Sequence, residues 1–180
     1  TAMINGYIPA ARFLPFLSWT DVAALPDKSN TVIVLPTGAI EQHGPHLPCS
    51  VDSVISSGVA GHALARLPAT IPAYAIPPIV YGKSEEHLHF PGTLTLSGDT
   101  LLHTLLEIAE SLYRAGFRKL LMINGHGGQP QILQIACREM RLRHGDFIAI
   151  PHDVFNVPNC EKQFLSPHEQ RMAKIGRAHV

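Results

Sequence analysis

Strand-like and helix-like patterns alternate along this chain of 180 residues. Four apolar runs predict strands, at 31–36, 74–80, 118–124 and 146–151. Four segments with apolar residues at helical spacing predict helices, at 18–26, 52–67, 97–116 and 130–145. Such alternation is typical of right-handed crossovers that join parallel strands. We therefore expect an α/β fold, with three α/β/α layers around a mostly parallel sheet.

Local signals indicate where these elements begin and end. Asp52 is the expected N-cap of the second helix, and Ser97 or Asp99 is the expected N-cap of the third. Pro77 and Pro78 place the second strand at an edge, because proline cannot donate a hydrogen bond to a neighbouring strand. Ligands of such sheets bind beyond the carboxyl ends of the strands, so function is expected in the loops after them.

The composition fits one neutral globular domain. Hydrophobic residues make up 46% of the chain, enough for a sizeable core, and acidic and basic residues each total 14. This balance offers no basic surface for nucleic acid and no polybasic patch for a membrane. No apolar run approaches the roughly 20 residues that span a bilayer, and the three cysteines lack metal-site spacing. We expect a soluble, cytoplasmic protein with a small-molecule partner.

The loop after the first strand, GAIEQHGPHLPCSVD at 38–52, concentrates ligating side chains in a chain with 11 histidines. Glu41 and His43 are two residues apart, which in extended backbone places both side chains on one side, and Asp52 opens the next helix. Each residue alone fits a solvated loop or a helix cap. Together they form a mixed N and O set that suits zinc or manganese. His46 is a candidate contact to these ligands or to a substrate.

The loop after the third strand, NGHGGQ at 124–129, places His126 between glycines, where the backbone can bend closely around a ligand. One interpretation adds His126 to the metal cluster. Another treats the loop as an anion nest that cradles a phosphate at the start of the next helix. The loop lacks a Walker lysine and the GxGxxG spacing, so we favour the metal. Asn124, Gly127 and Gly128 are then candidate contacts to the substrate or to the ligands.

A third loop, YGKSEEHLHFPGTLTLS at 81–97, carries two carboxylates and a His-x-His pair. The pair could ligate a metal, line the rim of a substrate site or be solvated. We favour the rim, which makes Glu86, His87 and His89 candidate substrate contacts.

These three motifs resemble the creatininase (creatinine amidohydrolase) family, in the family's order over residues 32–150. The resemblance implies an α/β/α fold and a centre of two divalent ions, zinc or manganese, with iron possible. It implies hydrolysis of a non-peptide, often cyclic, C–N amide bond. It also implies that Glu41, His43, Asp52 and His126 are metal ligands, with Asp52 bridging the ions. Family members form homo-oligomers that include hexamers.

One position departs from creatininase itself, which has a glutamate where this chain has Gly128. Relatives with the glycine supply a carboxylate from a downstream His-Ala-Gly-Glu or His-Ala-Gly-Asp segment, which also carries a proton-transferring histidine. The SPHEQ segment at 166–170 does not match that pattern. We therefore expect a single domain at 1–174 that is incomplete at its C-terminus, and an inactive chain. IGRAHV at 175–180 matches a reading frame of a common sequencing adapter and is expected to be foreign.

The preferred function is therefore a metal-dependent amidohydrolase that uses a metal-activated water. Two alternatives stay open at this point. The chain could be a metal-binding or small-ligand-binding module without catalysis, or a phosphate-binding α/β enzyme that uses the NGHGG loop.

Overall fold

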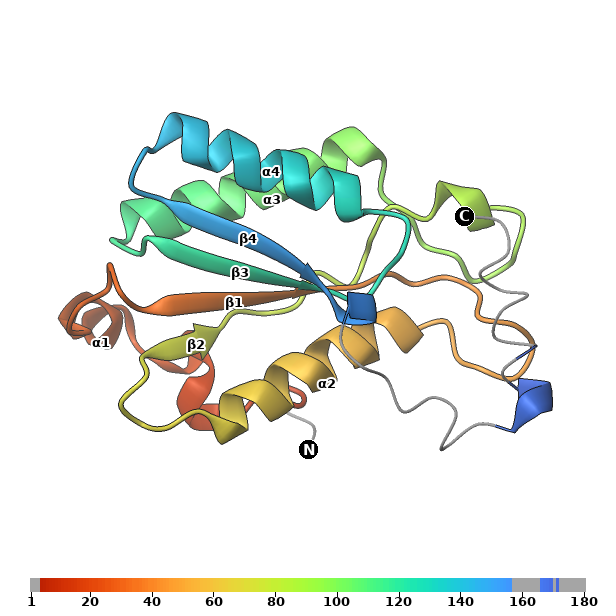
Figure 1. The fold of residues 1–180 in the computed structure, drawn as a ribbon, viewed down its shortest axis with the longest axis horizontal. Helices are drawn as coiled ribbons and strands as arrows, with labels where there is room; N and C mark the ends of the chain where they lie inside the picture. The colour runs from red at the N-terminus through yellow and green to blue at the C-terminus, as the bar shows by residue number, and fades with distance from the viewer. Residues whose placement is uncertain (1–3, 157–165, 170, 172–180) are drawn as a thin grey trace.

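Four parallel strands form one sheet in the order β2-β1-β3-β4 (Figure 1). The computed structural model describes residues 4–156, 166–169 and 171. The strands are β1 (Val32–Thr37), β2 (Ala73–Ala75), β3 (Lys119–Asn124) and β4 (Ile148–Asp153). The predicted mostly parallel sheet is confirmed.

Helices cover both faces of this sheet (Figure 1). α2 lies on one face, against β1 and β3, and α3 and α4 lie side by side on the other. The α-helices are α1 (Trp19–Ala24), α2 (Val51–Arg66), α3 (Gly98–Arg114) and α4 (Pro130–Arg143). The short 3-10 helices are η1 (Ala10–Arg12), η2 (Leu14–Phe16), η3 (Glu85–His87) and η4 (Val154–Asn156). The three-layer α/β/α architecture is therefore confirmed as well.

Successive side chains of the central strands enter opposite cores. Ile33 and Leu35 of β1 pack in the core under α3 and α4, whereas Val34 packs in the core under α2. In β3, Leu120 and Met122 belong to the first core and Ile123 to the second. Because both faces are buried, these strands are apolar between their end residues, which explains the uninterrupted apolar runs in the sequence.

Two expectations about the ends of elements were wrong. The regular ladder of β2 with β1 covers only Ala73–Ala75, because Pro77 and Pro78 cannot donate hydrogen bonds to continue it, and beyond them Ile79 forms an isolated bridge to Thr37. Asp52 is not the N-cap of α2: that position is Ser50, and Asp52 lies in the first turn of the helix. The side chain of Asp52 is thereby free for contacts outside the helix.

Parallel pairing places the carboxyl ends of three strands at one edge of the sheet. Thr37 of β1 pairs with Asn124 of β3, and Asn124 pairs with Asp153 of β4. The loops at 38–50 and 125–129 leave this edge together. Gly125 permits a tight fit there, because a Cβ at this position would lie 2.3 Å from the Asp52 carbonyl oxygen.

Within the described residues, no helix combines the length and apolarity needed to cross a membrane. The hexapeptide at 175–180 and Cys160 lie outside the described residues.

Candidate metal centre

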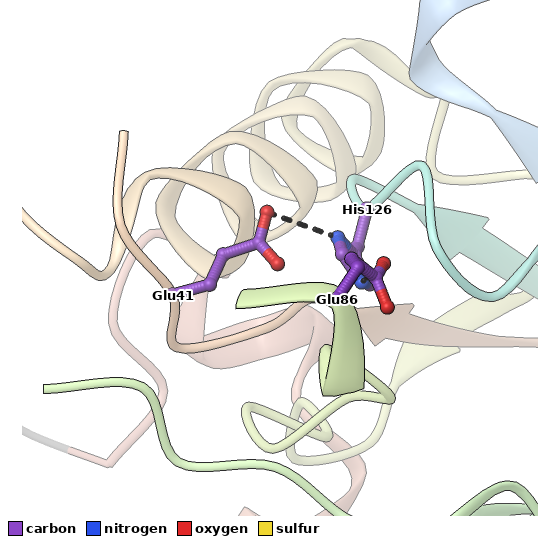
Figure 2. A group of neighbouring side chains, drawn as sticks. All are labelled: Glu41, Glu86 and His126. Carbon is purple, nitrogen blue, oxygen red and sulfur yellow. Dashed lines mark ion pairs between the residues drawn. The ribbon is translucent and has the colours of Figure 1, made fainter. Parts of the chain in front are cut away.

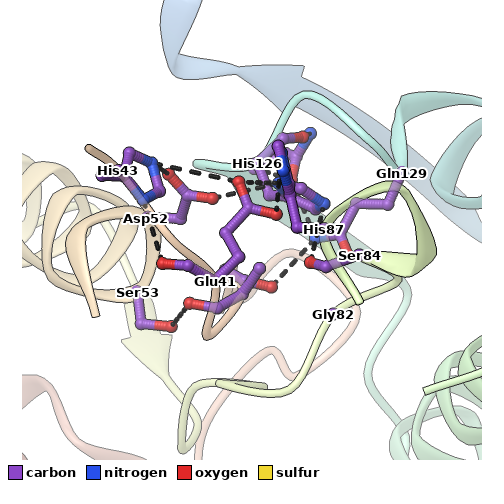
Figure 3. Close-up of polar contacts among 12 residues, drawn as sticks. Glu41, His43, Asp52, Ser53, Gly82, Ser84, His87, His126 and Gln129 are labelled. Carbon is purple, nitrogen blue, oxygen red and sulfur yellow. Dashed lines mark hydrogen bonds and ion pairs between the residues drawn. The ribbon is translucent and has the colours of Figure 1, made fainter. Parts of the chain in front are cut away.

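The structure brings the four predicted metal ligands together at the carboxyl edge of the sheet (Figure 3). Glu41 and His43 come from the loop after β1, Asp52 from the first turn of α2, and His126 from the loop after β3. They line a cavity of about 230 Å³. The lining residues are Glu41, His43, Val51, Asp52, Ile55, His87, His126, Gly127, Gly128 and Phe155.

Asp52 lies between the two histidines and uses a different oxygen toward each. Its Oδ1 is 2.9 Å from Nε2 of His43, and its Oδ2 is 3.0 Å from Nδ1 of His126. The side chain of Asp52 is 6% exposed, so both contacts are shielded from water. A carboxylate in this position can hold two cations side by side.

Backbone carbonyls fix which nitrogen each histidine turns toward Asp52. Nδ1 of His43 lies 3.2 Å from the Glu41 carbonyl oxygen, and Nε2 of His126 lies 2.7 Å from the Lys83 carbonyl oxygen. A carbonyl oxygen only accepts hydrogen bonds, so these nitrogens carry protons. In a neutral ring, the nitrogen that faces Asp52 is therefore the one with the lone pair, the atom that a metal would bind. Metal-ligating histidines are oriented by such bonds to carbonyls.

Glu41 adds a second carboxylate to the cluster. Its Oε1 lies 3.4 Å from Nδ1 of His126 and 3.9 Å from Nε2 of His43. Its Oε2 is buried without a hydrogen-bond partner, 3.8 Å from Nε2 of His87. Burial of a carboxylate oxygen without a partner costs free energy, so a cation bound beside this atom would stabilise it.

The electrostatics of the cluster favour positive charge. Burial lowers the pKa of His126, but the contacts with Asp52 and Glu41 outweigh burial and raise that pKa to about 10. For His43, burial again lowers the pKa, and the hydrogen bond and charge of Asp52 raise it above its usual value. Burial raises the pKa of Asp52, whereas His126 and His43 lower it, with a net decrease. A metal cation would compete with the protons of His43 and His126 for the ring nitrogens that face Asp52.

The donor set fits a divalent metal. Zinc binds imidazole nitrogen and carboxylate oxygen at about 2.0–2.2 Å, so in tetrahedral geometry its ligand atoms lie about 3.3–3.6 Å apart. The contacts of Asp52 to His43 (2.9 Å) and His126 (3.0 Å) are slightly shorter than this spacing. Two groups of ligands have all their donor atoms within 4.8 Å of one another: Glu41 with His43 and Asp52, and Glu41 with Glu86 and His126. Carboxylates this close to His126 also repel phosphate, which disfavours the phosphate alternative.

The remaining sequence candidates divide into those at the cavity and those away from it. His87, Gly127 and Gly128 line it. His87 is 1% exposed, whereas His89 is exposed, packs with its ring tilted against that of Phe90 and does not line the cavity. His46 does not line the cavity either, although both of its ring nitrogens are buried without hydrogen-bond partners.

Asn124 and Gln129 hold the loops of the site in place. Asn124 Nδ2 donates to the His126 carbonyl oxygen (2.7 Å), and Asn124 Oδ1 accepts from the His126 backbone N–H (3.1 Å). Gln129 Nε2 donates to Asn124 Oδ1 (3.0 Å) and to the Gly38 carbonyl oxygen (3.3 Å). Gln129 Oε1 accepts from the Lys83 backbone N–H (3.2 Å). Gln129 was missed in the sequence, where its place directly after NGHGG was the only signal.

Fold and site together define a three-layer α/β/α protein with a cluster of carboxylates and imidazoles suited to metal. The creatininase family model, described as creatinine amidohydrolase, matches residues 16–179. The chain therefore belongs to the creatininase family, as the three sequence motifs predicted.

Individual relatives support the same family. A mycofactocin precursor peptide peptidase of Mycolicibacterium smegmatis is 36% identical over 68% of this chain and 50% of its own length. A creatinine amidohydrolase of Pseudomonas putida is 34% identical over 72% of this chain and 52% of its own length. The chain thus spans about half the length of these relatives.

Solved structures agree in fold. A Glu-to-Gln mutant of creatininase, named as the Zn-Zn type, superposes with a TM-score of 0.71 at 31% identity. The match covers 86% of this chain and 63% of that one. A structure named as creatininase with Mn gives a TM-score of 0.70 at 30% identity, over 87% of this chain and 64% of that one.

Proposed function

We propose that this protein is a metal-dependent amidohydrolase that cleaves a C–N amide bond of a small molecule. The observation that carries the proposal is that Nε2 of His43 and Nδ1 of His126 face the two oxygens of Asp52. These four atoms repel one another unless protons or cations lie between them.

The proposed ligands are Glu41, His43, Asp52 and His126, with Asp52 shared between two ions. A divalent cation supplies Lewis-acid activation of water and of a carbonyl group. The protein's part is to hold the ligands in fixed positions, through the carbonyls of Glu41 and Lys83 and the side-chain bonds of Gln129. Zinc and manganese are the first metals to test, because the matched creatininase structures are named with them.

The cavity favours a compact substrate. Its volume of about 230 Å³ is below the usual range of about 300–1,000 Å³ for ligand pockets. Val51, Ile55 and Phe155 give it apolar walls beside the polar cluster. A small cyclic amide fits these dimensions, so a non-peptide amide is the preferred substrate class.

The test is hydrolysis assayed after removal and return of metal. The protein is treated with a chelator, dialysed, and supplied with Zn²⁺ or Mn²⁺ before incubation with creatinine or with a short peptide. These two substrates are chosen because one relative is named a creatinine amidohydrolase and another a precursor peptide peptidase. Metal-dependent turnover of creatinine supports the proposal, and turnover of the peptide alone overturns the non-peptide class. Tight metal binding without any turnover agrees with the predicted inactivity of this chain, and the same assay on a chain that carries the downstream His-Ala-Gly-Glu or His-Ala-Gly-Asp segment then separates an enzyme from a binding module.

A homo-oligomer, with a hexamer as one form, and a cytoplasmic location remain predictions. Light scattering of the purified protein tests the first, and cell fractionation tests the second.

A further inference from the structure

The cavity beside the polar cluster also has an apolar side, which two different elements supply. Val51 and Ile55 lie one helical turn apart on α2, so their side chains share one face of that helix. Phe155 lies in η4, directly after β4, and η4 contacts α2. All three residues line the cavity. A molecule that enters the cavity therefore meets apolar side chains from both α2 and η4.

The two sides of the cavity differ in how much of their surface is exposed. On the polar side, Glu41 is 6% exposed and His126 is 1% exposed, and their side chains point toward each other (Figure 2). On the apolar side, Phe155 is 47% exposed and Ile55 is 39% exposed. Removal of apolar surface from water is favourable in proportion to its area. The exposed side chains therefore favour a ligand that carries an apolar group.

The loop after β3 limits the shape of that group. Gly127 lines the cavity, and a Cβ at this position would meet no atom of the described residues within 4 Å, apart from those of its chain neighbours. The backbone of the loop is thus uncovered on this side, and a flat group can lie against it. The cavity volume of about 230 Å³ restricts the group to one small ring.

We propose that the substrate is an amide with a flat apolar ring beside the scissile bond, and that Phe155 and Ile55 bind the ring. This inference rests on the proposed amidohydrolase function and names the substrate class of the same site. The amide group faces the polar cluster, and the ring packs against the phenyl group of Phe155. Phe155 is the main specificity-determining residue, because it is the largest apolar side chain that lines the cavity.

The test compares the binding of benzamide and acetamide, which share the amide group and differ in the ring. The purified full chain is dialysed with Zn²⁺, and its bound zinc is measured by elemental analysis. Dissociation constants are then measured by NMR titration. Binding is the readout because we expect this chain to be inactive. The dissociation constant should be at least about tenfold lower for benzamide than for acetamide.

Variants assign this preference to the apolar side of the cavity. Phe155→Ala should weaken benzamide binding about tenfold and leave acetamide binding unchanged. Ile55→Ala should weaken benzamide binding in the same direction from the other element. Phe16→Ala is the matched control, because Phe16 is 41% exposed in η2 and does not line the cavity. Circular dichroism spectra and zinc content show that the variants are folded.

The outcomes separate this inference from the proposed function. Zinc binding with equal affinity for the two amides would overturn the substrate class and leave the metal-dependent function standing. Unchanged benzamide affinity in both Phe155→Ala and Ile55→Ala would overturn the assignment of the ring site. A wild type that binds no zinc would overturn the proposed function, and this inference with it.

Discussion

Oδ2 of Asp52 lies 3.0 Å from Nδ1 of His126, although the two residues come from the first turn of α2 and the loop after β3. The contact depends on the fold, because β1 and β3 must be neighbours for these two segments to meet. It also depends on the helix start, since Asp52 follows Ser50, the N-cap, and does not cap the helix itself.

Replacement of Asp52 should therefore impair metal binding more than replacement of an orienting residue. Loss of a residue that only orients a ligand typically costs about 10–100-fold in metal affinity, so we expect at least about 100-fold for Asp52→Asn. Isothermal titration with Zn²⁺ measures the change. Asp99→Asn is the matched control, because Asp99 is the exposed first-turn acid of α3. Equal affinity in the two variants would contradict the role of Asp52.

The stability of the protein in a chelating buffer should fall as the pH rises. Burial lowers the pKa of His126, but Asp52 and Glu41 raise it to about 10 in the folded state, against about 6.5 in an unfolded chain. The stabilisation is complete below about pH 6.5 and is lost as the pH rises through about 10. Thermal unfolding from pH 6.5 to 10 should show a falling Tm. The slope should be smaller in Asp52→Asn, and equal slopes would contradict the pairing.

Gln129 should be important for stability although it does not line the cavity. Gln129→Leu leaves the Lys83 backbone N–H and the Gly38 carbonyl oxygen without the partners they have in the wild type. With about 1–3 kcal/mol for each buried unsatisfied group, we expect the free energy of unfolding to fall by about 2–6 kcal/mol. Urea denaturation measures this loss. Gln134→Leu, at an exposed position of α4, should change stability by less than about 0.5 kcal/mol.

Most of the fold could be predicted from the sequence because its signals are local. The apolar runs of β1 and β3 and the helical spacing in α2, α3 and α4 each arise within one segment. The length of β2 was harder to predict. Pro77 and Pro78 limit its pairing with β1, but they do not indicate at which residue that short ladder begins.

The site could be predicted only in part, because its details depend on contacts between loops. Spacing in the sequence brought Glu41, His43 and Asp52 together as candidates. It could not indicate which nitrogen of His126 faces the cluster. The ring orientation depends on the contact between Nε2 of His126 and the Lys83 carbonyl oxygen, and Lys83 lies in another loop. Nor could the spacing show that Glu86, predicted as a substrate contact, lies beside His126, with 3.9 Å between its Oε1 and Nε2 of the ring.

We propose above that Asp52 holds divalent cations together with His43 and His126. The most direct measurement is anomalous X-ray diffraction at the zinc edge from crystals grown with Zn²⁺. Anomalous peaks are expected within about 2.0–2.2 Å of the Asp52 oxygens, Nε2 of His43 and Nδ1 of His126. No peak at these atoms in crystals that hold zinc elsewhere would contradict it.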